Sequence, residues 1–315
     1  MNKSDCILVT GGSGLVGSGV VRALKSKGFT NIISLSSKDC DLTDSSQVNQ
    51  LFSINKINYV FHCAGKVGGI IANSTAMTDF MLINLKMAIN VVEACHNYKV
   101  TKLAFFGSNC IYPRDTEQPI KEGCLLTGPL EKTNEGYALS KICGIKLCEY
   151  FNRDFGDRMI SLMPENMYGP GDNFHKTKSH VFAAFIRRFH EAKITNAKEV
   201  IIGGTGSPTR SFMHVDDLAD AAIFLMENYE STIPINVSTG TPTTIKELAL
   251  MMKDIIGFNG DLKFDSSIPD GTPYKLEDIS TITSLGWKSK IDLRTGIKNT
   301  YDWYVKALDK GLIRQ

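Results

Sequence analysis

The sequence predicts an α/β fold, in which a doubly wound (Rossmann) parallel sheet is joined to a smaller C-terminal lobe. An apolar run and a glycine-rich turn open the chain, strand and helix patterns alternate as far as residue 170, and the alternation weakens beyond it. Alternating strand and helix patterns are typical of a parallel sheet covered by helices on both faces. We expect 1–170 to form the sheet domain, about 205–240 to return to it, and 171–315 to form mainly the smaller lobe.

The composition is that of an ordinary globular protein. Of the 315 residues, 43% are hydrophobic and 22% are charged, and the net charge is +2. This balance gives no reason to expect a nucleic-acid or membrane partner. No apolar run has the length of a membrane span, and Met1 to Asp5 leave no room for a signal peptide, so we expect a cytoplasmic protein. The 8 cysteines lack metal-ligand spacing, so we expect reduced thiols and no metal site.

The first predicted strand, 6–10, is a continuous apolar run, as expected for a strand buried on both faces. A glycine-rich turn follows it and consists of Gly11, Gly12, Ser13, Gly14, Leu15, Val16 and Gly17. In such a turn Gly11 permits the tight bend, Gly14 lets the backbone approach a pyrophosphate, and Gly17 lets the next helix pack closely. Strand, turn and helix in this order therefore predict a dinucleotide site.

The second predicted strand, 31–35, bears on the choice of cofactor. Domains that bind NAD often place a carboxylate at the end of this strand, where it holds the ribose 2′-hydroxyl. Here the strand is followed by two serines and Lys38, which suit a 2′-phosphate. We therefore expect NADPH, with Lys38 at the phosphate and Asp41 at the adenine edge. The competing interpretation is that Lys38 is an ordinary solvated lysine.

The remaining elements continue the alternation. The predicted elements are a strand at 59–64, a helix at 80–98, a strand at 102–106, a helix at 135–151 and a strand at 159–163. The glycine-rich loop 65–69 lies where the strand at 59–64 ends, at the edge where such folds bind ligands. After residue 170, the loops at 171–173, 203–206 and 270–273 indicate a smaller lobe over this edge, which we expect to carry the substrate.

Three residues in the middle of the chain predict ketone reduction. Ser108 follows a predicted strand, and Tyr137 and Lys141 are four residues apart, so they share one helix face. We expect the ammonium of Lys141 to lower the pKa of the Tyr137 phenol and to hold the nicotinamide ribose. Ser108 would stabilise the carbonyl oxygen as charge develops on it. A Tyr-x-x-x-Lys pair alone is common on surface helices, but the glycine turn and Ser108 precede this one in the expected order.

Cys110 and His180 allow two interpretations. A thiolate at Cys110 would act as a base if nearby cations lowered the pKa of the thiol. A buried cysteine is more often a small apolar residue, however, and a single histidine is more often structural than catalytic. The residues by themselves leave both alternatives open.

Several longer motifs resemble the extended short-chain dehydrogenase/reductase family, and within it the GDP-4-keto-6-deoxymannose 3,5-epimerase/4-reductases. The resemblance covers nearly the whole chain and is densest from 66 to 217. The matching segments are 66–70, 107–113, 134–141, 168–174, 179–181, 187–189 and 210–212. The cysteine and histidine motifs within them distinguish this group from UDP-sugar epimerases.

The resemblance implies a function and a role for each matching residue. The implied reaction makes GDP-L-fucose through epimerisation and NADPH-dependent reduction, in a homodimer. Ser108, Tyr137 and Lys141 correspond to the reductase triad, Cys110 to the base and His180 to the acid of epimerisation. The implied cofactor contacts are the turn from Gly11 to Gly17, Lys141, Pro164 and Asn166. The implied contacts to the GDP-sugar are Arg188, Arg210, Asp270 and Lys275.

The chain also departs from the family pattern at several positions. Gly203 stands where a tryptophan is usual, which predicts extra space near the nucleotide sugar. Glu165 stands where a threonine is usual, and it would either contact an additional sugar hydroxyl or point away. Asn109 replaces a common serine, and Ser13 replaces an arginine found in some members, which leaves the 2′-phosphate to Lys38.

These departures keep three functions under consideration. The first is the bifunctional epimerase/reductase. The second is an enzyme that only reduces, or that acts on a related GDP-4-keto sugar such as a 6-deoxy-heptose. The third is a non-catalytic regulator that binds NADPH. All five expected catalytic groups are present in the sequence, which argues against the third function.

Overall fold

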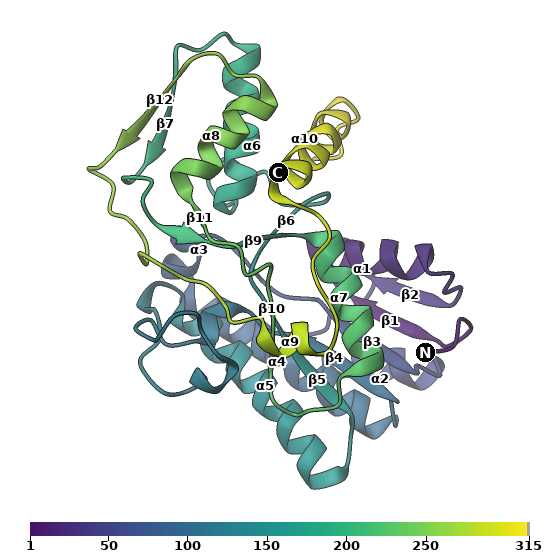
Figure 1. Cartoon of the computed structure of the whole chain (residues 1–315). Coiled ribbons are helices and arrows are strands. Elements are labelled where there is room, and N and C mark those ends of the chain that lie inside the picture. Colours follow the sequence, from purple (N-terminus) through teal and green to yellow (C-terminus); the bar gives the residue numbers. More distant parts are fainter. Residues whose placement is uncertain (314–315) are drawn as a thin grey trace.

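The computed structural model describes residues 1–313, and its centre is a parallel sheet (Figure 1). Within these residues six strands form this sheet in the order β10-β5-β4-β3-β1-β2. The strands are β1 (Ile7–Thr10), β2 (Ile32–Leu35), β3 (Tyr59–His62), β4 (Lys102–Phe106), β5 (Met159–Pro164) and β10 (Ile235–Val237). The predicted doubly wound α/β fold is therefore confirmed.

Helices cover both faces of the sheet, which explains why its strands are continuous apolar runs. On one face lie α1 (Leu15–Ser26) and α7 (Val215–Asn228). On the other lie α2 (Ser45–Ile54), α4 (Met77–Asn97) and α5 (Glu135–Phe155). Successive side chains of β1 alternate between these faces, since Ile7 and Val9 pack with α1 and α7 whereas Leu8 packs with the other three helices. These two apolar clusters pack the helices against the sheet and so hold in place its carboxyl edge, where the candidate site lies.

A second lobe stands beyond the carboxyl edge of the sheet (Figure 1). It contains α6 (Val181–Ile194), α8 (Ile245–Ile256) and α10 (Leu293–Asp309), together with β7 (Glu199–Gly203) and β12 (Asp261–Asp265), which pair in parallel. These elements have an apolar cluster of their own, with Phe182, Phe189, Leu248 and Ile297 at its centre. The lobe is thus held together separately from the two sheet faces.

Short strands and extended segments connect the two parts. β6 (Asn166–Tyr168) pairs with β9 (Phe212–His214), and β8 (Thr209–Arg210) pairs with β11 (Thr243–Thr244). The chain returns to the sheet at α7 and β10, and again at α9 (Ser280–Ser284), which packs in the same apolar cluster as α7. The shorter helical elements are α3 (Ile70–Thr75), η1 (Asn109–Ile111), η2 (Glu122–Cys124) and η3 (Lys132–Asn134).

Some helix bounds differ from the predicted ones. α4 starts at Met77, three residues before the predicted start, and α5 continues to Phe155, where Gly156 at φ 73° ends it in the left-handed conformation. No helix within residues 1–313 is long and apolar enough to cross a membrane. The same residues contain no cluster of three or more His, Cys, Asp or Glu side chains that could hold a metal ion.

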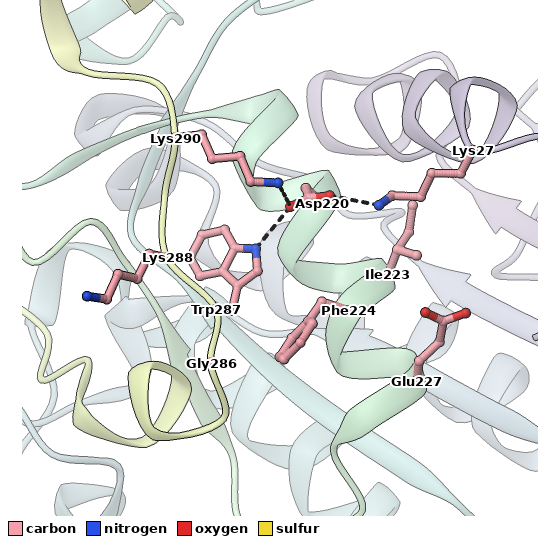
Figure 2. A pocket seen from close by; sticks show the side chains of 9 residues that line it. All are labelled: Lys27, Asp220, Ile223, Phe224, Glu227, Gly286, Trp287, Lys288 and Lys290. Carbon is pink, nitrogen blue, oxygen red and sulfur yellow. Dashed lines mark hydrogen bonds and ion pairs between the residues drawn. The ribbon is translucent and has the colours of Figure 1, made fainter.

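A cavity of about 290 Å³ lies on the α1/α7 side of the sheet and not at the candidate site (Figure 2). Asp220 of α7 lies at this cavity, where its carboxylate pairs with Lys27 at 2.9 Å and Lys290 at 2.8 Å, and accepts a hydrogen bond from the Trp287 indole. Burial opposes ionisation here, but these three donors prevail and lower the pKa of Asp220 to about 2. The cluster therefore fastens the segment after α9 to α1 and α7.

Candidate active site

The glycine-rich turn between β1 and α1 leaves room for a ligand only because its glycines lack Cβ atoms. Gly11 has φ 66°, and a Cβ there would lie 2.8 Å from the Cα of Ala64. A Cβ at Gly17 would lie 2.2 Å from the carbonyl oxygen of Gly11. Gly14 is the N-cap of α1, and no side chain of the described residues caps it. The free N–H groups of this helix start fit the diphosphate of a dinucleotide.

The turn after β2 contains a carboxylate, Asp39, that the sequence analysis did not consider. The Asp39 carboxylate accepts hydrogen bonds from Ser36, at 2.8 Å from its backbone N–H and 2.6 Å from its hydroxyl. These bonds hold the pKa of Asp39 below its usual value. The Ser36 hydroxyl expected at a 2′-phosphate is thus occupied by Asp39, whereas Lys38 is exposed. Asp41, expected at the adenine edge, accepts from the Thr43 N–H and hydroxyl at 2.9 and 2.8 Å.

Ser108 and Cys110 lie in a short turn at the carboxyl end of β4. The Ser108 hydroxyl caps η1 by accepting from the Cys110 N–H at 3.4 Å. The Cys110 side chain is only 7% exposed, and its burial raises the pKa of the thiol. The ammonium groups of Lys275 and Lys141 and a hydrogen bond with Ser108 act in the opposite direction. These are the cations that the sequence argument required near a basic thiolate.

Tyr137 and Lys141 project from the first turns of α5 beside this turn. Lys141 is buried, its ammonium donates to the Phe106 carbonyl at 2.8 Å, and it lies 5.9 Å from the centroid of the Tyr137 ring. Burial lowers the pKa of Lys141 to about 8.

The expectation that Lys141 lowers the pKa of Tyr137 is wrong in this arrangement. Burial is the largest influence on the phenol and raises its pKa, and the nearby Cys110 raises it further. A hydrogen bond with Ser108 opposes the rise without reversing it. The Lys141 ammonium donates to the Phe106 carbonyl. The cost of removing water from a Tyr137 phenolate therefore outweighs the attraction between that phenolate and Lys141. Tyr137 therefore holds its proton at neutral pH.

His180 is the N-cap of α6, on the lobe side of the site. The glycine-rich loop 65–69 reaches from Lys141 to this position. A Cβ at Gly65 would lie 3.7 Å from the Lys141 Nζ, and a Cβ at Gly69 would lie 3.3 Å from the Ser179 carbonyl oxygen. The His180 side chain keeps an exposed surface, but the surrounding atoms desolvate its ring and lower its pKa. His180 therefore stands as a mostly neutral imidazole facing solvent.

Asn84 anchors this loop, and sequence reasoning missed it. Its Oδ1 accepts from the Lys66 N–H at 2.9 Å, and its Nδ2 donates to the Lys66 and Phe80 carbonyls at 3.0 and 2.6 Å. Asn84 is buried within α4, and a single polar residue on a helical pattern gives no local sign of such a partner. It fixes the loop that lies between Lys141 and His180.

The junction of β5 and β6 contains Pro164, Glu165 and Asn166. Asn166 donates from its side chain to the Ser211 carbonyl at 2.9 Å. Glu165 is 4% exposed, and its carboxylate accepts from the Ser238 hydroxyl and from the Thr239 N–H at 3.0 Å. Of the two orientations that the sequence left open, the side chain adopts the one that points away, into the protein. It is not free to contact an additional sugar hydroxyl.

The four residues expected at the GDP-sugar lie in different surroundings. Lys275 acts electrostatically on Cys110, and Arg210, half-buried, donates to the Thr209 carbonyl at 2.7 Å. The exposed Arg188 donates to the Ile201 carbonyl at 2.9 Å. Asp270 accepts from the Thr205 N–H and hydroxyl at 2.9 and 2.6 Å, so its carboxylate already fastens the loop after β7.

The extra space expected at Gly203 is partly filled by another residue. A Cβ at Gly203 would lie 3.1 Å from the Cδ1 of Ile268, in the segment after β12. Ile268 is about half exposed. It therefore supplies apolar surface next to the position where the family usually has a tryptophan, so the expected space is reduced.

Comparison with known proteins identifies the family of this chain. The model of the NAD dependent epimerase/dehydratase family matches residues 7–238. That span contains the glycine-rich turn, Ser108, Tyr137 and Lys141 and makes up most of the chain. The chain belongs to this family.

Individual members of the family match over almost the whole chain. GDP-L-fucose synthase 1 of Arabidopsis thaliana is 50% identical over 97% of this chain and 94% of the relative. A GDP-6-OMe-4-keto-L-xylo-heptose reductase from Campylobacter jejuni superposes with a TM-score of 0.93, at 36% identity over 97% and 99% of the two chains. A GDP-L-fucose synthetase from Naegleria fowleri, bound to NADP, superposes with a TM-score of 0.92, at 28% identity over 100% and 98%.

Proposed function

We propose that this protein is an NADPH-dependent 3,5-epimerase/4-reductase that converts GDP-4-keto-6-deoxy-D-mannose to GDP-L-fucose. The observation that carries the proposal is the cluster of Ser108, Cys110, Tyr137 and Lys141 at one edge of the sheet, where the Lys275 ammonium acts on the thiol. Half-identity with a GDP-L-fucose synthase over nearly the full length supports the same reaction.

Epimerisation is assigned to Cys110 and His180. A ketone at C4 acidifies the hydrogens on both C3 and C5, so one acid/base pair next to that ketone can invert both centres through enolates. Cys110 removes the proton, and Lys275 and Lys141 favour its thiolate against the effect of burial. Ser108 and Tyr137 donate to the enolate oxygen. His180 returns a proton on the other side from the protonated fraction of its imidazole, which the lowered pKa makes the stronger acid when charged.

Reduction is assigned to Tyr137, Ser108 and Lys141. NADPH supplies the hydride to C4 when it is bound. The phenol of Tyr137, whose pKa is raised by burial, carries the proton that O4 requires. Ser108 would hydrogen-bond the same oxygen, and Lys141, fixed by the Phe106 carbonyl, would hold the nicotinamide ribose.

Binding is divided between the two parts of the chain. Residues 1–170, with about 205–240, hold the cofactor through the turn from Gly11 to Gly17, Lys38, Asp41, Pro164 and Asn166. The lobe of 171–315 holds the nucleotide sugar, where the guanidinium groups of Arg188 and Arg210 suit a diphosphate because they bind it with several charge-assisted hydrogen bonds. Lys275 and the loop fixed by Asp270 complete this subsite. We propose a cytoplasmic homodimer as the working form.

A related GDP-4-keto sugar is the second candidate substrate. The likeness to a GDP-4-keto-heptose reductase favours it, as does Ile268, which is smaller than a tryptophan, at the wall beside Gly203. The presence of Ser108, Cys110, Tyr137, Lys141 and His180 disfavours a purely regulatory protein.

Substrate-dependent oxidation of NADPH separates these candidates. The purified protein is mixed with NADPH and either GDP-4-keto-6-deoxymannose or a GDP-4-keto-heptose, and the loss of NADPH is followed with Y137F as the control. The proposal predicts a higher kcat/KM for the deoxymannose derivative. A preference for the heptose would support the second candidate, and oxidation of neither sugar would contradict both.

A further inference from the structure

A buried polar network lies behind the Ser108–Cys110 turn and contains two carboxylates. Glu277 is 1% exposed, and it accepts from the Asn109 amide at 2.6 Å and from the Ser211 hydroxyl at 3.1 Å. The Ser211 hydroxyl also contacts the Ser238 hydroxyl, at 3.5 Å between the two oxygens. Ser238 is in turn hydrogen-bonded to Glu165, which also accepts from the Thr239 N–H. Two serine hydroxyls therefore link two buried carboxyl groups.

This arrangement requires one additional proton. The chain Glu165–Ser238–Ser211–Glu277 contains three contacts, and each serine hydroxyl has a single hydrogen to donate, so the two hydroxyls can supply only two of them. If Ser211 donates to Glu277 and Ser238 donates to Ser211, the contact between Ser238 and Glu165 needs a hydrogen on Glu165. Two adjacent buried carboxylates also cannot both be ionised at low cost. The pair therefore holds one shared proton.

The surrounding charges place this proton on Glu165. Glu277 interacts electrostatically with two cations, Arg210 and Lys275, and accepts the amide hydrogen of Asn109. Glu165 is desolvated and faces the charge of Glu277, and both raise its pKa, against the effect of its own hydrogen bonds. The Tyr112 and Tyr168 phenols are the other titratable groups that interact with the pair.

The segment that carries Glu277 also carries Lys275. It runs extended between β8 and the loop at Ile120, with Lys275 N–H donating to the Thr209 carbonyl and Ile120 N–H to the Leu276 carbonyl. In an extended segment, residues two apart project to the same side. The ammonium of Lys275 and the carboxylate of Glu277 therefore both face the turn of Asn109 and Cys110, one acting on the thiol and the other holding the amide.

We propose that Glu165 and Glu277 share one proton, held by Glu165, and that the pair positions Cys110 beside Lys275 through Asn109. Glu165, Glu277 and Asn109 are positioning residues, since they act through the turn and not on the substrate. The role given to Cys110 rests on the proposed function, whereas the shared proton does not.

The shared proton is tested directly by infrared spectroscopy. The difference spectrum of the wild-type protein and E165Q at neutral pH should contain the carbonyl band of a protonated carboxylic acid, lost in the variant. Absence of this band would overturn the proposal. D217N is the matched control, because Asp217 is an equally buried carboxylate that accepts from the Lys290 and Ile291 N–H groups away from this network.

The positioning role is tested by the reactivity of Cys110. Alkylation of the Cys110 peptide is followed by mass spectrometry across pH in the wild type, N109A, E165A, E165Q and D217N. N109A and E165A remove parts of the network that holds the turn. The pH profile of Cys110 alkylation should then move to higher pH by about half a unit or more, because the Lys275 ammonium favours the thiolate less. E165Q should keep the wild-type profile, since its amide donates to Ser238 as the acid does.

The substrate provides a second readout. In N109A, deuterium exchange at C3 and C5 should fall by about ten- to a hundredfold with KM changed less than about twofold, as expected for a displaced catalytic group. An unchanged alkylation profile in N109A, or a shift as large in D217N, would overturn the positioning role. A third outcome separates the two proposals. If the infrared band and the alkylation shifts of the variants are found but the wild type exchanges no deuterium at C3 and C5, the proton shared by Glu165 and Glu277 is supported and the proposed function fails.

Discussion

Substitution of Gly17 by alanine should weaken NADPH binding while leaving most of the fold intact. The added Cβ would lie 2.2 Å from the Gly11 carbonyl oxygen, 2.7 Å from its carbonyl carbon and 2.9 Å from the Gly12 Cα. All three atoms belong to the backbone, so a rotamer change cannot relieve the overlap, and the glycine-rich turn must open instead.

The size of this effect follows from opposing contributions. Because the overlap is with backbone atoms, its cost lies in the upper part of the usual range for overpacking, about 2–3 kcal/mol, and the higher helix propensity of alanine returns about 1 kcal/mol. The remaining ~1–2 kcal/mol destabilises the turn that binds the diphosphate. The affinity for NADPH should therefore be about five- to thirtyfold weaker.

Fluorescence titration with NADPH measures this loss, and G19A is its control. Gly19 lies in the same helix, and a Cβ there would lie 2.8 Å from the Val215 Cγ2 on the α7 side, away from the turn. G19A should lower Tm and leave the Kd within about twofold of the wild type. If folded G17A also binds NADPH as the wild type does, the assignment of this turn to the diphosphate is refuted.

Other substitutions test separate parts of the account. Y137F should slow reduction by about 10²- to 10⁴-fold, because O4 loses its proton donor, with an unchanged Kd for NADPH; steady-state kinetics measures this, and normal turnover would remove Tyr137 from the reaction. C110S should slow exchange of C3 and C5 hydrogens with deuterated water by about a hundredfold, and exchange at the wild-type rate by NMR would mean that another group is the base. K38E should weaken NADPH about tenfold more than NADH, since only NADPH carries the phosphate, and equal losses in a binding titration would contradict this role. D220N should lower the free energy of unfolding at pH 7 by about 1–2 kcal/mol in urea titrations. Because the folded pKa of Asp220 is lowered to about 2, this contribution is complete above the unfolded value near 3.8 and is lost as pH falls toward 2, so a pH-independent difference would contradict the ion-pair explanation.

The fold and the clustering of the site could be predicted because local patterns encode them. A buried parallel strand must be apolar throughout, and the glycines at positions 11 and 17 stand where a Cβ would meet backbone. Tyr137 and Lys141 share a face simply because they are one helical turn apart. Ser108 was found from its place after a strand, since the carboxyl ends of parallel strands meet at one edge.

The sequence did not predict features that depend on residues distant in the chain. The pKa of Tyr137 is set by burial among several elements, whereas the sequence spacing shows only that Lys141 is near. Ile268 fills space beside Gly203 from a segment 65 residues away. The contact between Asn109 and Glu277 joins residues 168 apart, and Glu277 belongs to none of the motifs. Such pairings arise when the lobe folds over the sheet edge, which no local pattern encodes.

NMR of the product formed in deuterated water tests the central claim most directly. The protein is incubated with NADPH and GDP-4-keto-6-deoxymannose, and the product is examined at C3, C4 and C5. The account predicts GDP-L-fucose with deuterium at C3 and C5, because Cys110 and His180 exchange those protons before Tyr137 completes reduction at C4. A sugar reduced at C4 without deuterium at C3 and C5 would contradict it.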